Sequence, residues 1–402
     1  MAISEASPKE ETLKENPRSR RIQIVIILVV VFLFWVSLYV YVPTLPVYVE
    51  GKVEDLSWVG FILATYGIWQ MIVRLPLGIA SDRVGRRKPF VLVGLVLSAI
   101  GSLIMGNTRG VTGLAVGRSL SGLAASTWVT LLILFNGMFS SQDAVRATSL
   151  LTLVNSVGRT LATGVTGTLN NLGGDSLAFT VAAGAGLIAV LAMFLVREKH
   201  RPKKNASGKE IFALITRRDV LLPSLLNMVR QYATYGVTFS FIPILASQFG
   251  ATDVQLSFLA SMNIAIGIAG NLFAAVAVKK IGSRKLIFGS IYLMSSAIGL
   301  AAVANNLEVI FIAQFLNGLA AGIGYPVLMG SSIEYVSEGE RATAMGLHQA
   351  VYAIGMSVGP WLGGILADSL GIQPMFAWTT VGYLGLSLVG ARMLSTKNFD
   401  SE

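Results

Sequence analysis

Long apolar segments recur along the whole length of this chain. They fall at about 22–46, 57–80, 89–107, 112–136, 147–170, 176–196, 221–247, 254–278, 286–305, 309–333, 342–367 and 374–394. Each is near or above the roughly 20 residues that a helix needs to cross a bilayer. Only 13% of the residues are charged, against roughly 25% in soluble proteins. The sequence therefore predicts an all-α membrane protein with twelve transmembrane helices.

The basic residues predict the orientation of these spans. With the N-terminus placed in the cytoplasm, the cytoplasmic segments hold 25 Lys and Arg, and the opposite loops hold only Lys52 and Arg109. Because cytoplasmic loops carry an excess of Lys and Arg, both termini are expected in the cytoplasm of a protein of the cell membrane. The net charge of +10 is then a signal of topology on a face that contacts anionic lipid, and nucleic acid is not expected as a partner.

Several classes of chemistry are excluded by the residues that the chain lacks. It has no cysteine, and its only histidines are His200 and His348. These counts exclude disulfides, thiol nucleophiles and clustered His or Cys metal sites. No nucleophile and base stand at a recognisable spacing, and the first apolar run is too long for a cleaved signal peptide. We expect neither an enzyme nor a bound metal or cofactor.

The chain reads as two copies of one six-span design. Residues 83–88, 118–122 and 145–148 recur as 280–285, 314–318 and 340–343, and the turn-forming Pro43 aligns with Pro243. The predicted divisions are a cytoplasmic tail (1–21), a first bundle (22–196), a cytoplasmic linker (197–219), a second bundle (220–395) and a cytoplasmic tail (396–402). Such repeats place a binding site between the halves near the bilayer midplane, where one half rocks against the other.

A motif at the end of the second span carries a family resemblance. It reads Gly78-Ile-Ala-Ser-Asp82-Arg83-Val-Gly85-Arg86-Arg87-Lys88. This resembles the G-x-x-x-D-R-x-G-R-R-K signature of the major facilitator superfamily, and the resemblance implies a gate latch formed by Asp82, Arg83 and Arg87. Gly78 is expected to allow close helix approach, and Asp82 to pair with Arg83 or cap a neighbouring helix. The alternative is that the basic run only fixes topology.

Two further patterns look like motifs of the same superfamily. The fourth span carries Arg118 and Gly122 within LAVGRSLSGLAA, which is similar to an arginine motif associated with proton-coupled members. The eleventh span carries the glycine and proline pattern Gly355, Gly359, Pro360, Gly363 and Gly364, which permits close helix packing and a bend. In antiporters of the family this pattern lies on the fifth span, where this chain has lost its proline and keeps one glycine, so the chain departs from the usual drug–proton antiporter.

Four arginines lie inside predicted spans, and no acid falls clearly inside one. They are Arg74, Arg118, Arg159 and Arg230. Intramembrane charges mark functional sites by default. Arg74 is interpreted as structural, through snorkelling or pairing with Asp82, whereas Arg118 suits a structural role and a transport role equally. Our hypothesis is that Arg159 and Arg230, near mid-depth in opposite halves, clamp an anionic group of the substrate; water, carbonyls or amides are the alternative partners.

The remaining candidate residues would make this cavity amphipathic. They are Trp35, Tyr39, Gln70, Tyr235, Asn263 and Gln314. Packing, an interfacial aromatic belt and bridges between helices are the competing interpretations. His348, about two turns into the eleventh span, is the candidate for proton coupling, and its alternative is a hydrogen-bonded packing histidine. Exchange of one anion for another needs no such group.

The function expected from these observations and the resemblance is secondary active transport by alternating access. The first interpretation is proton-coupled efflux of a small amphipathic or anionic organic molecule by a monomer. The second is uptake or exchange of an organic anion, which the arginines and the altered fifth span favour. A sensor that does not transport, or a lipid scramblase, is the remote alternative.

Overall fold

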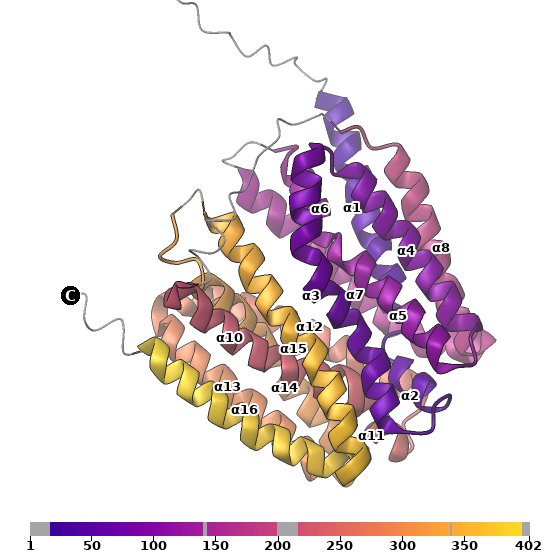
Figure 1. The fold of residues 1–402 in the computed structure, drawn as a ribbon, viewed down its shortest axis with the longest axis vertical. Helices are drawn as coiled ribbons and strands as arrows, with labels where there is room; N and C mark the ends of the chain where they lie inside the picture. Colours follow the sequence, from indigo (N-terminus) through magenta and orange to yellow (C-terminus); the bar gives the residue numbers. More distant parts are fainter. Residues whose placement is uncertain (1–16, 140–142, 199–215, 338–339, 396–402) are drawn as a thin grey trace, which may run out of the picture.

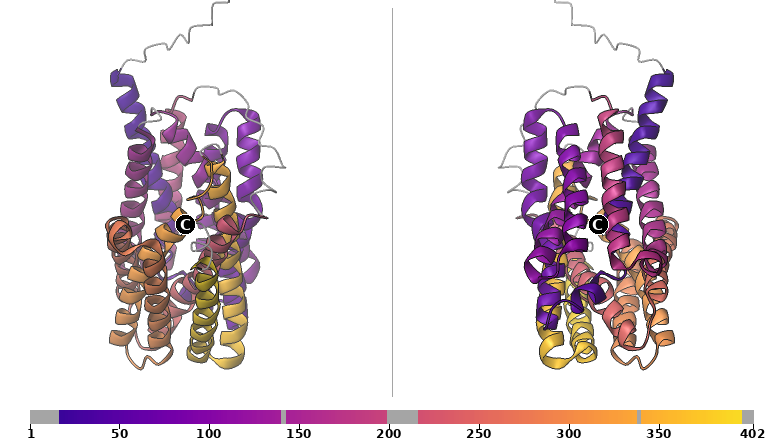
Figure 2. Two further views of the ribbon diagram at one scale, coloured as in Figure 1. Left: turned by 90° about the vertical axis from the view of Figure 1, so that its left-hand side faces the viewer. Right: turned by 90° about the vertical axis from the view of Figure 1, so that its right-hand side faces the viewer.

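The computed structural model describes residues 17–139, 143–198, 216–337 and 340–395. Most of the predicted tail 1–21, most of the linker 197–219 and the whole tail 396–402 lie outside the described residues. Long helices dominate the described part, and Figure 2 shows them running side by side along the long axis of the molecule.

The helices follow the predicted spans in order. In the first half they are α1 (Pro17–Tyr39), α2 (Leu45–Glu50), α3 (Leu56–Val84), α4 (Lys88–Asn107), α5 (Val111–Ser126), α6 (Trp128–Asn136), α7 (Ala144–Gly173) and α8 (Asp175–Phe194). In the second half they are α10 (Arg218–Ala233), η2 (Thr234–Phe241), α11 (Ile242–Gln248), α12 (Asp253–Ile281), α13 (Ser283–Ala302), α14 (Leu307–Ser331), α15 (Arg341–Leu370) and α16 (Ile372–Ser395). Within the described residues, nine helices are long and apolar enough to span a membrane, and the predicted all-α membrane fold is confirmed.

Three of the predicted spans are broken near their middle or outer part. The first is interrupted between Tyr39 and Leu45, a stretch that contains Pro43. The seventh passes from α10 through the π-helical stretch η2 into α11, and Pro243 lies in the first turn of α11. The fourth breaks at Thr127, whose hydroxyl donates to the carbonyl of Ala124 over 2.7 Å. Irregular backbone at membrane depth is tolerated where it lines a cavity or is buried in protein.

The two halves meet along α3 with α15 and along α7 with α12 (Figure 1). Glycines permit this contact. A Cβ on Gly67 would lie 2.6 Å from the carbonyl carbon of Met356, and one on Gly60 would lie 2.7 Å from the Cα of Gly364. Real side chains do not approach backbone this closely, so the α3–α15 contact requires both glycines. We call this contact the glycine seam, comprising Gly60, Gly67, Met356 and Gly364.

Hydrogen bonds tie the halves together at the ends of the spans where α3, α12 and α15 meet short loops. The backbone N–H of Leu56 donates to Oδ1 of Asp368 over 3.1 Å. The N–H of Gly167 donates to Oγ of Ser257 over 2.6 Å, and Nδ2 of Asn170 donates to Oδ2 of Asp253 over 2.8 Å. This end of the molecule, which we call the tied end, is therefore closed by backbone and side-chain bonds from both halves.

Candidate functional site

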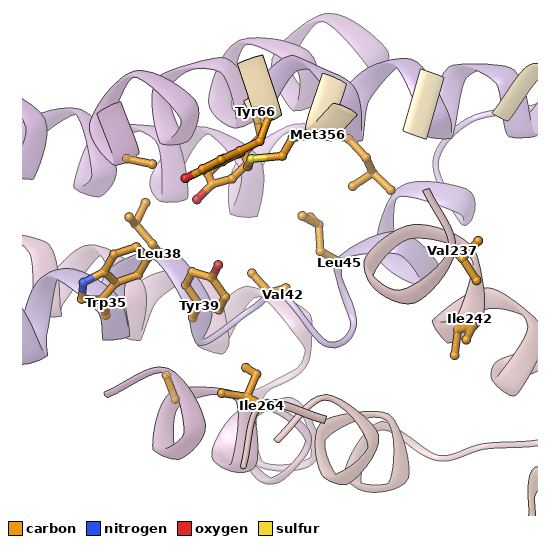
Figure 3. Packing of buried hydrophobic residues seen from close by; sticks show 14 of the residues in the cluster. Trp35, Leu38, Tyr39, Val42, Leu45, Tyr66, Val237, Ile242, Ile264 and Met356 are labelled. Atoms are coloured by element: carbon orange, nitrogen blue, oxygen red, sulfur yellow. The ribbon is translucent and has the colours of Figure 1, made fainter. Parts of the chain in front are cut away.

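A cavity lies between the halves where the first and seventh spans are broken. Its lining consists of Leu38, Tyr39, Val42, Tyr66, Arg118, Tyr235 and Phe239. A neighbouring cavity shares Val42 and Phe239 and adds Asn263 and Gln314. Figure 3 shows Tyr66 facing Leu38 and Tyr39 across this region. Four of the predicted site residues are almost fully buried here: Tyr39, Arg118, Asn263 and Gln314. The region beside the broken helices is therefore a polar and aromatic site inside an apolar core.

Arg118 reaches this cavity from α5. Its guanidinium carbon lies 4.2 Å from the centre of the Tyr66 ring, and its side chain is almost fully buried. Two of its nitrogens, Nε and Nη1, are buried without a hydrogen-bond partner. A desolvated cation over an aromatic face gains about 2 kcal/mol, which offsets only part of the cost of burying an arginine.

Arg159 approaches the same group of rings from α7. Its guanidinium carbon lies 4.3 Å from the Tyr39 ring centre and 5.6 Å from that of Trp35, and its buried Nε has no hydrogen-bond partner. In the part of the chain that the structure describes, no carboxylate lies within ion-pair distance of Arg118 or Arg159. The structure thus brings two arginines of the first half together around Tyr39 and Tyr66.

Arg74 links the two halves near this cavity. Its Nη1 donates to the hydroxyl of Tyr352 over 2.9 Å and to Oε1 of Gln349 over 3.3 Å, both on α15. Its Nη2 donates to Oε1 of Gln70. Gln70, predicted to line the cavity, thus bonds to Arg74. The partners of Arg74 are these three side chains, and the expected pairing with Asp82 is not formed.

Arg230 lies in a separate cluster within the second half. Its Nε donates to Oδ1 of Asn227 over 2.8 Å, and its Nη2 donates to Oε1 of Gln231 over 3.0 Å. The guanidinium carbon is 5.4 Å from the centre of the Tyr325 ring. Amides, which were the predicted alternative to a substrate anion, thus hold Arg230 here. His348 is fully buried and bonds to Asn227 of the same cluster.

The predicted gate motif forms a compact turn between α3 and α4. Gly85 ends α3 with a φ of 69°, in the left-handed region that favours glycine. Asp82 pairs with Arg87 over 2.7 Å, and the expected pairing with Arg83 is wrong because Asp82 bonds to the other end of the turn. The expected close helix approach at Gly78 is also wrong, since a Cβ there would meet no atom within 4 Å.

The acid that caps α4 is Glu198, which sequence reasoning did not single out. Its carboxylate accepts from the backbone N–H of Arg87 and, over 2.9 Å, from that of Lys88 at the start of α4. A carboxylate at a helix N-terminus satisfies free donors and the positive end of the helix dipole. Asp82, expected as a possible cap, does not fill this role. Contacts between residues more than 100 positions apart leave no local signal in the sequence.

Removing this cap is expected to loosen the gate turn. We expect Glu198→Ala to destabilise the protein by about 1–2 kcal/mol, the typical cost of leaving a charged hydrogen bond unmade. Glu198→Gln keeps one acceptor and should lose about half as much. Thermal unfolding of the purified protein in detergent measures both, and equal stability of Glu198→Ala and the parent protein would show that the cap contributes nothing.

The glycines of α15 serve two different contacts. Gly355 and Gly359 face Tyr232 and Gly236 of the seventh span, and Gly363 faces the ring of Phe241. Gly364 faces Leu56 and Gly60 of α3, and the carbonyl of Pro360 also lies against Gly60. The pattern therefore packs α15 closely against helices of both halves.

Two tyrosines that complete the site were missed. Tyr325 and Tyr352 pack edge to face with ring centres 6.2 Å apart, and they contact Arg230 and Arg74 respectively. The chain has 11 tyrosines, and nothing in the local sequence separates these two from tyrosines that only pack. Their role follows from the intramembrane arginines that they approach.

Known proteins resemble this chain over nearly its whole length. A sequence profile described as Major Facilitator Superfamily matches residues 27–230 and 224–402. Multidrug resistance protein 1 of Bacillus subtilis is 22% identical over 92% of this chain and 96% of its own length. The quinolone resistance protein NorA of Staphylococcus aureus is 23% identical over 91% of this chain and 95% of its own length.

Solved structures share the fold. A bacterial homolog of the human lysosomal transporter Spinster, in an inward-facing and unoccupied conformation, superposes with a TM-score of 0.81 at 14% identity over 95% of this chain and 98% of its own. The nucleoside transporter NupG superposes with a TM-score of 0.77 at 17% identity over 94% of this chain and 99% of its own. With its intact gate motif, its twelve-span order and this profile match, the chain belongs to the major facilitator superfamily of membrane transporters.

Proposed function

We propose that this transporter carries a small amphipathic organic molecule with an anionic group through the cavity between its halves. The observation that carries the proposal is the pair Arg118 and Arg159, held over aromatic rings without a described carboxylate. The guanidinium carbons lie 4.2 Å and 4.3 Å from the nearest ring centres, and buried donor atoms remain unpaired on both arginines. A carboxylate, sulfonate or phosphate would satisfy such donors, while Tyr39, Tyr66 and Phe239 would contact the apolar part of the molecule.

Alternating access explains how the cavity would empty and fill. The bonds of the tied end close one side in the present conformation. The gate turn lies at the other end of α3, where Asp82 bonds within its own turn. With the termini in the cytoplasm, as the basic loops predict, this is a conformation closed to the outside. The latch of Asp82, Arg83 and Arg87 would then engage the second half when the cavity opens outward.

Proton-coupled efflux is the first candidate for the direction of transport. It is supported by the resemblance to relatives named for multidrug and quinolone resistance and by the position of Arg118 in its motif. Uptake or exchange of an organic anion is the second candidate, and it is supported by the two unpaired arginines. In proton-coupled efflux, the anion would move in the direction opposite to the proton. In proton-coupled uptake, the anion and the proton would move in the same direction.

Reconstituted vesicles test the proposal. Uptake of radiolabelled amphipathic anions and cations would be measured with a pH gradient of either sign and without a gradient. We expect saturable transport of an amphipathic anion that competes with other anions and not with cations. Transport of cations alone would refute the anionic substrate, and the sign of the gradient that accelerates transport decides the direction.

A further inference from the structure

A chain of buried hydrogen bonds connects His348 on α15 to Arg230 on α10. Nε2 of His348 lies 2.7 Å from Nδ2 of Asn227, and Nδ1 lies 3.0 Å from Oγ of Ser224. On its other side, Asn227 accepts from Nε of Arg230 through Oδ1 over 2.8 Å. All four side chains are almost fully buried, so none of them exchanges partners freely with water. Asn227 is thus the only side chain that bonds to both the histidine and the arginine in this chain of contacts.

These contacts assign the position of the proton on His348. Arginine has donors only, so Asn227 must turn its carbonyl oxygen to Arg230 and its NH2 group to His348. Nε2 then accepts a hydrogen bond and carries no proton. Ser224 donates its single proton to the carbonyl of Val220 over 2.6 Å, and it therefore accepts from Nδ1–H. Both sides of the ring assign the same neutral tautomer, with the proton on Nδ1.

We propose that protonation of His348 is relayed through Asn227 and releases Arg230. A proton on Nε2 would face the NH2 group of Asn227, and two donors cannot bond to each other. The amide relieves this conflict by turning over, which presents its oxygen to the imidazolium. Its NH2 group then faces Nε of Arg230, and one of the two side-chain bonds that hold Arg230 is lost. The Nε2 proton and the Asn227–Arg230 bond therefore exclude each other.

The surrounding groups leave the new charge unbalanced. Arg230 faces His348 from α10, and Tyr352 lies on α15 with its ring centre 6.1 Å from that of His348. The ring centre of Tyr325 on α14 lies 5.4 Å from the guanidinium carbon of Arg230. Tyr383 of α16 interacts electrostatically with Arg230, and Arg74 of α3 bonds to Tyr352. None of these described groups is a carboxylate. An imidazolium at His348 consequently repels Arg230 as well as breaking its bond to Asn227.

The relay predicts the direction in which the substrate moves relative to the proton, and this prediction rests on the anionic substrate proposed above. With its bond to Asn227 lost, Nε of Arg230 is available to an anion, and an anion bound to Arg230 favours the proton on His348. By linkage, proton and anion then increase each other's affinity. A carrier that binds both together moves them in the same direction. Where the relay operates on the substrate, it selects uptake over proton-driven efflux.

Nuclear magnetic resonance can observe His348 alone. The chain has only two histidines, so His200→Gln with a histidine-free affinity tag leaves a single imidazole in the full-length protein. In detergent at high pH, the 15N spectrum is expected to show a protonated Nδ1 and an unprotonated Nε2. A neutral imidazole with its proton on Nε2 would overturn the assignment and with it the relay.

A double-mutant cycle separates the relay from the charge of Arg230 acting through space. The titration midpoint of His348 would be compared in the single-histidine parent, Arg230→Gln, Asn227→Leu and the double variant. We expect Arg230→Gln to raise the midpoint by about one pH unit, a tenfold gain in proton affinity. In the Asn227→Leu background the same change should have less than half this effect, because the connecting amide is absent. Equal shifts in both backgrounds overturn the relay.

Two further variants keep the test decisive. Gln231→Leu removes the other side-chain bond of Arg230 and is the matched control, since it should leave the tautomer of His348 unchanged. Asn227→Asp is of similar size and accepts from both neighbours, so His348 should remain doubly protonated to a higher pH than in the parent. A midpoint that does not rise in Asn227→Asp contradicts the relay even if Asn227→Leu fails to fold.

An anion probe tests the link to the proposed function. Benzenesulfonate at constant ionic strength should raise the midpoint of His348 in the parent and not in Arg230→Gln, while benzyltrimethylammonium should raise it in neither. If the double-mutant cycle shows coupling and benzenesulfonate has no effect, the relay stands and binding of this class of anion at Arg230 is refuted. An anion response without coupling in the cycle refutes the relay.

Discussion

Replacing Gly60 with valine is expected to slow transport about a hundredfold. A Cβ at this position would lie 2.7 Å from Cα and 3.0 Å from N of Gly364. Because both groups belong to backbone, no side-chain rotation relieves the conflict, and overpacking of this kind costs about 3 kcal/mol. The conformation with the tied end closed would become rare by about two orders of magnitude. A carrier that must visit this conformation in every cycle slows accordingly.

Distance measurements can observe this loss of closure directly. The chain has no cysteine, so Glu54→Cys with Ser369→Cys provides two unique sites for spin labels beside the tied end. We expect a longer distance between the labels in Gly60→Val than in the parent. Gly382→Val on α16 is the matched control, because a Cβ there meets no atom within 4 Å. A parent-like distance and transport rate in Gly60→Val would contradict the need for the glycine seam.

If the substrate is the proposed organic anion, replacing Arg118 or Arg159 with glutamine is expected to weaken its binding roughly ten- to hundredfold, because loss of a charged hydrogen bond costs about 1.5–3 kcal/mol. Lysine restores the charge but not the paired donors, and it should recover only part of the affinity. Concentration dependence of transport in vesicles gives the change in half-saturation for each variant. The two losses should not add in the double variant, because both guanidinium groups would bind the same anion.

An exposed arginine on the same helix provides the control. Arg146 lies at the start of α7 and is exposed, and Arg146→Gln should leave the half-saturation unchanged. An equally unchanged value for Arg159→Gln would refute the anion site. A loss in Arg230→Gln as large as that in Arg159→Gln would instead support the clamp across both halves that the sequence suggests.

The spans and their charges could be predicted from the sequence because they depend on local composition. Twelve apolar segments and the four intramembrane arginines follow from residues near one another in the chain. An arginine at mid-depth is costly in any fold. Predicting these features required no knowledge of which distant residues pack against them.

The partners of the arginines could not be predicted, since they depend on how distant helices pack. The sequence predicts Arg159 near mid-depth of its span, but the packing of α7 against α1 brings it to Tyr39. Arg74 donates a hydrogen bond to Tyr352, which lies 278 residues further along the chain. Arg230 was predicted to face the same cavity as Arg159, and in the structure amides of its own helix hold it. Whether the two share a substrate stays a prediction.

Arg118 and Arg159 also expose the empty carrier to the membrane voltage. Neither arginine has a described carboxylate partner, so the cavity carries two positive charges. The membrane voltage drops across the closed part of the protein, between this cavity and the side to which it is closed, and acts on both charges. The full field changes the energy of each charge by about 2.3 kcal/mol per 100 mV. A potential that is negative inside therefore favours the empty carrier with its cavity open inward, and a bound anion reduces this bias. Transport would be measured in vesicles held at different voltages. The rate at which the empty carrier returns should change with voltage, whereas the rate of exchange of one anion for another should be almost independent of voltage.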